Sequence, residues 1–483
     1  MSRRRVLWTF GITATALFMV ALDNLVVTTA LPVIRHELGA SLQQLEWIVN
    51  AYTLTFAVLL LTGAALGDRF GRRRIFIVGL AIFTAGSALA ALSTTSDGLI
   101  VARAIQGLGG AIVTPLTLTI LSAAVPPERR AVALGAWGGI GGLAIAIGPL
   151  VGGAIVEGVA WQAIFWLNVP IGLVAIGLAL TRLDESFGPR ESLDLPALGL
   201  ASAGLFAIVW AVIHGNEYGW SDGRILGGLA GGALLLLGFI AREARTAAPM
   251  LPLRFFSIKA FSAANAVSFL MYFGMFGSIF LLSQFFQVVQ GLSPFQAGLR
   301  TLPWTGMPAI VAPIAGLLAA RIGARPLLVV GMLLQAIGLA WLSAVSSPTV
   351  EYAVLVPAFI VSGIGMGLFF APIADVVLSA VRPEEEGKAS GATNTIREIG
   401  GVFGVAVLAA VFAGSGAYTS PQAYVDGLIP AIRLGAVVLA IGAVVALALP
   451  VRRAVAGRTT VPAGAATEAG APAYAYAEIE PGA

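Results

Sequence analysis

Runs of about twenty apolar residues recur along the whole chain, and they constrain its fold more than any other feature. A run of that length crosses the hydrocarbon core of a bilayer as an α-helix. Charged residues make up only 11% of the 483 residues, against roughly 25% in soluble globular proteins. Barrel strands alternate apolar and polar residues, and these runs do not. The sequence therefore predicts an all-α polytopic membrane protein.

Fourteen of these runs are predicted to be transmembrane helices. They cover residues 6–31, 45–66, 75–92, 99–125, 131–155, 162–180, 195–213, 225–240, 260–288, 296–319, 327–345, 353–381, 396–412 and 428–449. Arginines precede the first run as in a signal peptide, but the run is too long for one and no good cleavage site follows. We therefore expect the first helix to be retained.

The distribution of basic residues predicts the orientation of the chain. Cytoplasmic loops of membrane proteins carry an excess of Lys and Arg. With the N-terminus in the cytoplasm, all but five of the 28 Lys and Arg residues fall on the inner side, the exceptions being Arg35, Arg103, Arg224, Arg300 and Arg433. We expect a multi-pass protein of the plasma or inner membrane, with both termini cytoplasmic.

A charged loop, GDRFGRRR at residues 67–74, separates the second and third runs, and it has a weaker copy later in the chain. The copy, GLLAARIGARP at residues 316–326, has Ala320 where the first loop has Asp68. Such a repeat predicts two related six-helix bundles with a site between them, a common transporter design. We expect bundles at 1–185 and 251–450, inserted helices at 186–250, and a disordered cytoplasmic tail at 451–483.

Asp23 is the strongest candidate for ion chemistry. It lies deep within the first run, and a carboxylate at this depth costs a few kcal/mol or more. It either makes a structural hydrogen bond to a neighbouring helix or takes a proton or a cation. Asn24 and Thr28 are four residues apart and form an adjacent polar stripe.

Arg103 and Gln106 share one face of the fourth predicted helix, because they are three residues apart. A buried arginine must face a cavity or a partner, so Arg103 could oppose protonation of a nearby carboxylate or hold an anion. Alternatively, it snorkels to the outer interface, since it lies near that end of the helix. Both interpretations stay open at this point.

Two other groups of polar residues are candidates for the transport path. Asp375 and Glu398 are candidates for a second acidic site, although pairing with Arg382 or Arg397 at the interface is favoured. Side chains that suit the wall of a polar and aromatic cavity lie in the ninth predicted helix, namely Asn265, Gln284, Gln287, Phe280, Phe285 and Phe286. The aromatic residues fit lipid contact or simple packing equally well.

Several kinds of chemistry are not expected. The chain has no cysteine and only two histidines, so disulfides, thiolate metal sites and a clustered membrane enzyme are excluded. It contains no G-x-x-x-x-G-K-[ST] loop for ATP, and a net charge of +4 is weak support for nucleic-acid binding. We expect neither a metal nor a cofactor, and transport would draw on an ion gradient.

Five short motifs together resemble those of the major facilitator superfamily, and more narrowly its fourteen-helix drug:proton antiporters. The resemblance covers about residues 6–450. The motifs are the charged loop with Asp68, Arg69, Gly71, Arg72 and Arg73, LDNLVVTTALP at 22–32, RAIQG at 103–107, GPLVGG at 148–153 with Gly148, Pro149, Gly152 and Gly153, and WQAIFWLNVPIG at 161–172. The chain departs from the usual pattern at Thr28, where Asn is common, at Ala64, where Gly is usual, and at Gln162, where a basic residue is common.

The resemblance implies roles for particular residues. Asp23 would couple proton movement, and Arg103 would tune its protonation or line the path. Asp68 would meet the start of the thirteenth helix, around residues 391–394, in the outward-open state. Arg69 or Arg72 would pair with Glu128.

The resemblance also implies a function, namely export of amphipathic drugs, antibiotics or related natural products in exchange for protons by alternating access. The partners would be a small-molecule substrate, protons and the lipid bilayer. A narrow-substrate metabolite exporter and a proton-coupled importer of the same fold are the alternatives.

Overall fold

The structure is a computed structural model that describes residues 3–188, 194–246, 249–382 and 385–450, which form helices and connecting loops. The first part of the chain contains seven helices: α1 (Arg3–Leu38), α2 (Leu42–Phe70), α3 (Arg72–Ala91), α4 (Ser96–Ala124), α5 (Pro127–Gly158), α6 (Ala163–Trp166) and α7 (Asn168–Arg182). Two further helices follow, α8 (Leu195–Tyr218) and α9 (Gly223–Glu243).

The last part of the described chain begins with a short 3-10 helix. Its elements are η1 (Leu253–Ser257), α10 (Lys259–Gln284), the π-helical turn η2 (Phe285–Val289), α11 (Pro294–Thr305), α12 (Met307–Ile322), α13 (Ala324–Val345), α14 (Tyr352–Ser379), α15 (Glu386–Ser415) and α16 (Pro421–Ala446). The predicted all-α class is confirmed for the described residues.

The number of membrane spans is close to the prediction. Within the described residues, twelve helices are long and apolar enough to cross a membrane, and a bent pair in α2 raises the count to thirteen. The remaining predicted span, residues 131–155, falls in α5, where only Ala146–Gly158 is found as a shorter apolar helix. The structure therefore supports up to thirteen of the fourteen predicted spans.

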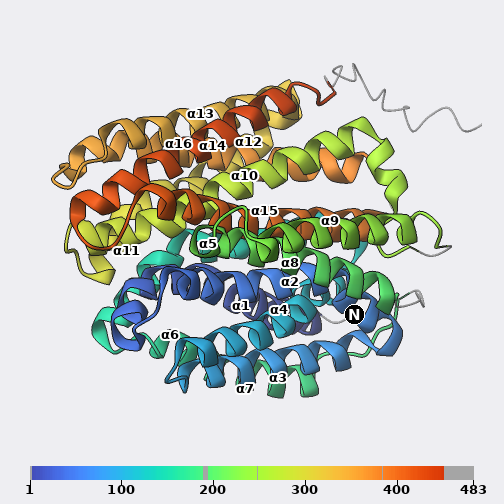
Figure 1. Cartoon of the computed structure of the whole chain (residues 1–483). Coiled ribbons are helices and arrows are strands. Elements are labelled where there is room, and N and C mark those ends of the chain that lie inside the picture. The colour runs from blue at the N-terminus through green and yellow to red at the C-terminus, as the bar shows by residue number, and fades with distance from the viewer. Residues whose placement is uncertain (1–2, 189–193, 247–248, 383–384, 451–483) are drawn as a thin grey trace, which may run out of the picture.

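The helices lie in two groups with α8 and α9 beside them (Figure 1). Helices α1 to α7 occupy the lower part of the view, and α10 to α16 the upper part. Helix α8 packs against both groups through one apolar cluster, in which Leu54 of α2 and Val402 of α15 meet Leu205 and Val209 of α8. The start of α1 and the end of α16 lie at the same end of the molecule.

Local sequence signals define where the helices begin. Ser41 and Gln44 form a capping box at the start of α2, and Ser293 and Gln296 form another at the start of α11. In a capping box, each side chain satisfies a backbone N–H that the helix leaves unpaired. Gly71 joins α2 to α3 with φ of 107°, a conformation that residues with a Cβ rarely adopt.

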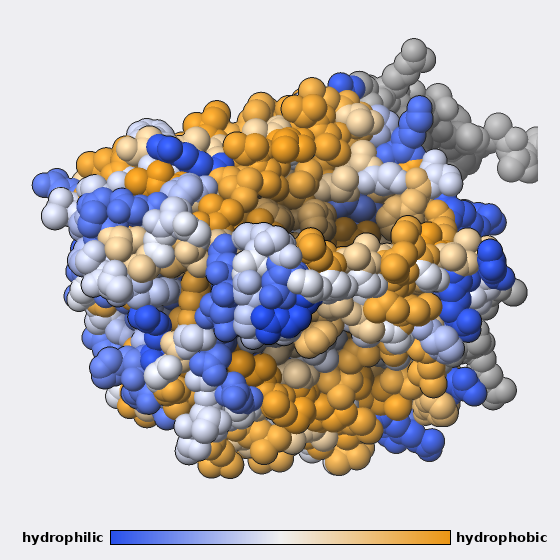
Figure 2. Space-filling view, viewed as in Figure 1, coloured by the Kyte–Doolittle hydropathy of each residue, from blue (hydrophilic) through white to orange (hydrophobic). Residues whose placement is uncertain are grey.

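The surface fits a lipid environment. Figure 2 shows large apolar areas above and below the middle of the molecule, with hydrophilic residues toward its two ends and in a patch at the centre of this face. Large side chains such as Leu173, Leu317 and Val444 are more than half exposed. Extended apolar surfaces of this kind are rare on soluble monomers, and they fit lipid contact instead.

Candidate functional site

An ion pair between Asp23 and Arg103 lies at the centre of the first helix group. Arg103 Nη1 donates a hydrogen bond to Asp23 Oδ2, which joins the middle of α1 to the third turn of α4. The Asp23 side chain is only 2% exposed, and the Arg103 side chain is only 1% exposed. Arg103 therefore does not snorkel to the membrane surface, and its partner is the carboxylate itself.

Two amide side chains complete the surroundings of the Asp23 carboxylate. Gln106 Nε2 donates to Asp23 Oδ1 over 2.7 Å, and Asn168 Nδ2 donates to the same oxygen over 2.8 Å. Gln106 also donates to Ser87 Oγ over 2.8 Å. Both carboxylate oxygens therefore accept hydrogen bonds, one from a cation and the other from two neutral amides.

The guanidinium of Arg103 is enclosed by groups of the same bundle. Its Nε donates to the Ile48 carbonyl oxygen over 3.2 Å, and its Nη1 also donates to Gln106 Oε1 over 2.6 Å. The Tyr52 ring lies 4.2 Å and the Phe165 ring 5.7 Å from its central carbon. Electron-rich ring faces attract a cation, more strongly where water is excluded.

Sequence reasoning missed three members of this cluster. Asn168 lies in the WLNVPIG string, which was noted only as a motif, although an amide at the start of a membrane helix is itself a signal. Ser87 and Tyr52 had no signal that set them apart from other polar residues of membrane helices. All three are buried within the bundle.

The predicted polar stripe beside Asp23 has a mixed outcome. Asn24 is half-buried, and its Oδ1 has no hydrogen-bond partner among the described residues. The Thr28 hydroxyl donates to the Leu25 carbonyl of its own helix over 2.6 Å. The Thr28 carbonyl instead accepts a hydrogen bond from Ser283 of α10, over 2.8 Å.

The polar residues predicted on the ninth helix lie on α10 and η2, and two of them reach other elements. Gln287 donates to the Thr29 carbonyl of α1 over 2.9 Å, and Gln284 accepts from the Tyr418 hydroxyl over 2.6 Å. Asn265 donates to the Phe261 carbonyl one turn earlier over 2.9 Å.

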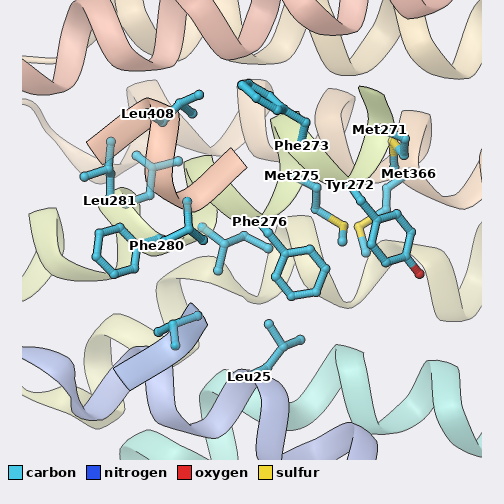
Figure 3. Packing of buried hydrophobic residues seen from close by; sticks show 14 of the residues in the cluster. Leu25, Met271, Tyr272, Phe273, Met275, Phe276, Phe280, Leu281, Met366 and Leu408 are labelled. Carbon is cyan, nitrogen blue, oxygen red and sulfur yellow. The ribbon is translucent and has the colours of Figure 1, made fainter. Parts of the chain in front are cut away.

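The aromatic residues predicted beside them, Phe280, Phe285 and Phe286, are all buried in packing. A different set of α10 side chains faces α1. In Figure 3, Tyr272, Met275 and Phe276 lie beside Met366 of α14, on the side of α10 toward Leu25.

The glycines of the GPLVGG motif bring α5 against both α1 and α11. A Cβ on Gly152 would lie 2.5 Å from Thr29 Oγ1, and one on Gly153 would lie 2.3 Å from the Pro294 carbonyl oxygen. A Cβ on Gly298 of α11 would in turn lie 2.3 Å from the Pro149 carbonyl oxygen. Gly148 faces Leu25. Small residues permit this close helix contact.

The charged loop lies at the opposite end of the bundle from these contacts, near the start of α1. Arg72 Nε lies 2.7 Å from Asp68 Oδ1, and the Asp68 carbonyl accepts from the Gly188 N–H over 3.1 Å. In this conformation the Asp68 carboxylate pairs within its own loop, so its contact with residues 391–394 stays a prediction for the outward-open state. Arg69 lies over the Phe70 ring.

Glu185 is a partner of this loop that the sequence did not indicate. Its carboxylate accepts from the Arg73 N–H over 2.9 Å and lies 3.6 Å from Arg74 Nε. The predicted partner Glu128 has a side chain outside the described part of the structure. Its pairing with Arg69 or Arg72 stays a prediction.

The two candidates for a second acidic site lie in the second helix group. Glu398 in α15 has an Oε2 atom that is buried and has no hydrogen-bond partner among the described residues. Neighbouring Arg397 instead donates to Asn394 Oδ1 over 3.4 Å and lies within 6 Å of the Tyr272 and Phe369 rings. Asp375 is exposed near the end of α14.

Two groups of membrane helices and a buried ion pair between helices define a multi-pass membrane protein of the carrier type. The sequence profile of the Major Facilitator Superfamily matches residues 13–405. The chain belongs to this superfamily, as the motifs predicted.

Curated relatives and solved structures agree with the assignment. The chain is 36% identical to the tetracenomycin C resistance and export protein of Streptomyces glaucescens, covering 87% of this chain and 78% of that one. It is 40% identical to the cephamycin export protein CmcT of Amycolatopsis lactamdurans, over 84% and 85%. A bacterial homologue of the human lysosomal transporter Spinster, solved inward-facing and unoccupied, shares the fold at a TM-score of 0.63 and 17% identity, over 93% and 98%.

Proposed function

We propose that this protein is a proton-coupled antiporter that exports amphipathic antibiotics or related natural products across the cell membrane. The observation that carries the proposal is the buried cluster of Asp23, Arg103, Gln106 and Asn168. Relatives described as export or resistance proteins for tetracenomycin C and cephamycin support the direction of transport and the kind of substrate.

The cluster suits proton coupling because its charges balance. A proton on Asp23 would remove the negative charge that compensates Arg103, which is 1% exposed. A buried charge without a partner is strongly unfavourable, typically by about 3–5 kcal/mol when one partner of a buried pair is removed. Proton uptake would therefore be tied to a rearrangement around Arg103, and such a link is what an antiporter needs.

Contacts between the two helix groups suggest which state this is. Ser283 and Gln287 bond to the end of α1 farther from its N-terminus, and Thr305 of α11 donates to the Ala146 carbonyl over 3.1 Å. If both termini are cytoplasmic, these contacts close the outer side. Asp68 on the inner side pairs with Arg72 of its own loop, so we infer an inward-facing state.

The energy source would be the proton gradient. One charge that moves through about 100 mV releases roughly 2.3 kcal/mol, which equals roughly a 50-fold gradient of a neutral solute at about 1.36 kcal/mol per factor of ten. The unpartnered Glu398 oxygen is proposed as a second acidic group, and its chain neighbour Arg397 lies beside the Tyr272 and Phe369 rings.

A narrower function is the second candidate, because the two relatives are each named for one antibiotic. A susceptibility panel in an efflux-deficient host separates the two. Protection against several unrelated compounds supports a multidrug exporter, whereas protection against one class supports a dedicated exporter.

The proposal is tested in proteoliposomes with an imposed proton gradient. Wild-type protein should accumulate substrate against its gradient and release protons on the opposite side, and Asp23→Asn should abolish both while inserting normally. Asp426→Asn, at an exposed carboxylate of α16, is the matched control and should transport like wild type. Undiminished proton-driven transport by Asp23→Asn would refute the assignment.

A further inference from the structure

Glu46 and Asn50 form a buried polar face on α2 that has no role in the mechanism so far. They are four residues apart, so their side chains share one side of the helix. Glu46 is 2% exposed and Asn50 is fully buried. Glu46 Oε2, Asn50 Oδ1 and Asn50 Nδ2 all lack a hydrogen-bond partner among the described residues.

Such a face is costly unless something binds to it. A buried polar group without a partner costs roughly 1–3 kcal/mol, and a charged one costs more. Ionisable residues within membrane helices are rare for this reason, and they commonly mark ion or substrate pathways. Because these two side chains leave three buried polar atoms without partners, we interpret the face as a binding site and not as a local defect in packing.

Residues from the second helix group lie near this face. Tyr418, in the loop between α15 and α16, interacts electrostatically with both Glu46 and Arg35. Arg35 lies 3.8 Å above the Tyr418 ring, and its Nε has no hydrogen-bond partner among the described residues. None of the ion pairs among the described residues includes Glu46. The Tyr418 hydroxyl donates to Gln284 Oε1 over 2.6 Å. Glu46 thus lies where the two helix groups meet, and the nearby arginine does not neutralise it.

The contrast with Asp23 decides where an incoming cation can bind. Asp23 already accepts hydrogen bonds from Arg103, Gln106 and Asn168. A cation could bind Asp23 only after displacing one of these donors. Glu46 has a free acceptor, and the Asn50 carbonyl oxygen is a second acceptor one turn away.

We propose that Glu46 and Asn50 form a binding site for a positively charged hydrogen-bond donor at the boundary between the two bundles. The donor is either a proton or the ammonium group of a transported compound, since both supply positive charge to a carboxylate. The inference rests on the proposed export function and adds an acidic site in α2 to it.

Two measurements on the purified full-length protein test the site without any need for transport. The first is labelling of wild-type protein with N,N′-dicyclohexylcarbodiimide, which reacts with protonated carboxyl groups in apolar surroundings, followed by peptide mass spectrometry. The second is equilibrium binding of ethidium, a cationic aromatic probe, to wild type and to Glu46→Gln. Glu351→Gln, at an exposed carboxylate beside α14, is the control.

The two readouts separate the sources of the charge. Labelling of Glu46, whether or not Asp23 is labelled as well, supports a proton site. At least a tenfold weaker ethidium affinity in Glu46→Gln than in Glu351→Gln supports an ammonium site. If Glu46 stays unlabelled between pH 6 and pH 9 and its Gln variant binds ethidium like the control, the proposal is overturned.

Protein stability and the parent proposal are controlled separately. The labelling arm uses unmodified protein, so it is independent of whether Glu46→Gln folds. In size-exclusion chromatography, Glu46→Gln should elute as one monodisperse species, as a folded variant does. Should Asp23→Asn retain proton-driven transport, the coupling role proposed for Asp23 fails, while both readouts at Glu46 keep their meaning.

Discussion

Arg103 of α4 donates to the Asp23 carboxylate of α1 across 80 positions of sequence, and both side chains are buried. Each charge is tolerated at this depth because the other one is present. Replacing either residue with its neutral counterpart, Asp23→Asn or Arg103→Gln, should therefore lower the melting temperature of the detergent-solubilised protein, because each replacement leaves the other charge unpaired in the bundle.

The double variant Asp23→Asn with Arg103→Gln provides the check on this pairing. Its loss of stability should be smaller than the sum of the two single losses, because neither charge is then left alone. Strictly additive losses would show that the two residues contribute independently.

Asn168 is expected to support transport through the carboxylate it contacts. Its Nδ2 donates to Asp23 Oδ1 over 2.8 Å, and hydrogen bonds to charged groups contribute about 1.5–3 kcal/mol. Asn168→Ala should slow proton-driven export at least fivefold in proteoliposomes. Gln422→Ala, at an exposed amide of α16, should not. Equal rates in both variants would argue against a role for Asn168.

Close contact between α5 and α11 should control opening at that end of the molecule. Gly153→Val would place a Cβ 2.3 Å from the Pro294 carbonyl oxygen, whereas a Cβ on Gly139 of the same helix meets nothing within 4 Å. Gly153→Val should therefore hold the bundles apart, and Gly139→Val should not.

The absence of cysteine from the sequence makes this measurement simple. A single Ser283→Cys substitution reports access to the contact between α10 and α1. A membrane-impermeant maleimide should label it faster in the Gly153→Val background than in the Gly139→Val background. Identical labelling rates would show that this glycine does not govern closure.

The pKa of the Asp194 carboxyl group predicts that acid weakens the packing of α8 on α9. Burial alone would raise the pKa of its carboxyl group, but hydrogen bonds from Arg242 and from the Ala197 N–H outweigh it and lower the pKa below the ordinary value. A lowered pKa in the folded state means that the ionised form contributes stability above the unfolded pKa of about 3.9. That contribution is lost as the pH falls through the pKa of Asp194 in the folded state.

Thermal unfolding as a function of pH checks this sign. The melting temperature of wild type should exceed that of Asp194→Asn by a constant margin above about pH 5, and the margin should shrink below about pH 4. Asp426→Asn should show no such convergence. A margin that grows in acid would contradict the assignment.

The sequence by itself determined the membrane class, nearly all the helices and the positions of the exceptional charges. Hydrophobicity and run length act within each segment, so they can be read without knowing what the segment packs against. The same holds for Asp23, Arg103 and the loop at Asp68, because a charge in or beside an apolar run is conspicuous wherever the helix lies.

Only the tertiary structure decided which of these groups meet. Asn168 contacts Asp23 because of how the helices are rotated, and Glu185 contacts the charged loop because of how the linker after α7 lies. Small differences in packing decide both. Glu46 was overlooked because it lies near the start of its predicted helix, where a glutamate can be solvated. Its burial results from packing beside α15 and Tyr418, which belong to the other half of the chain.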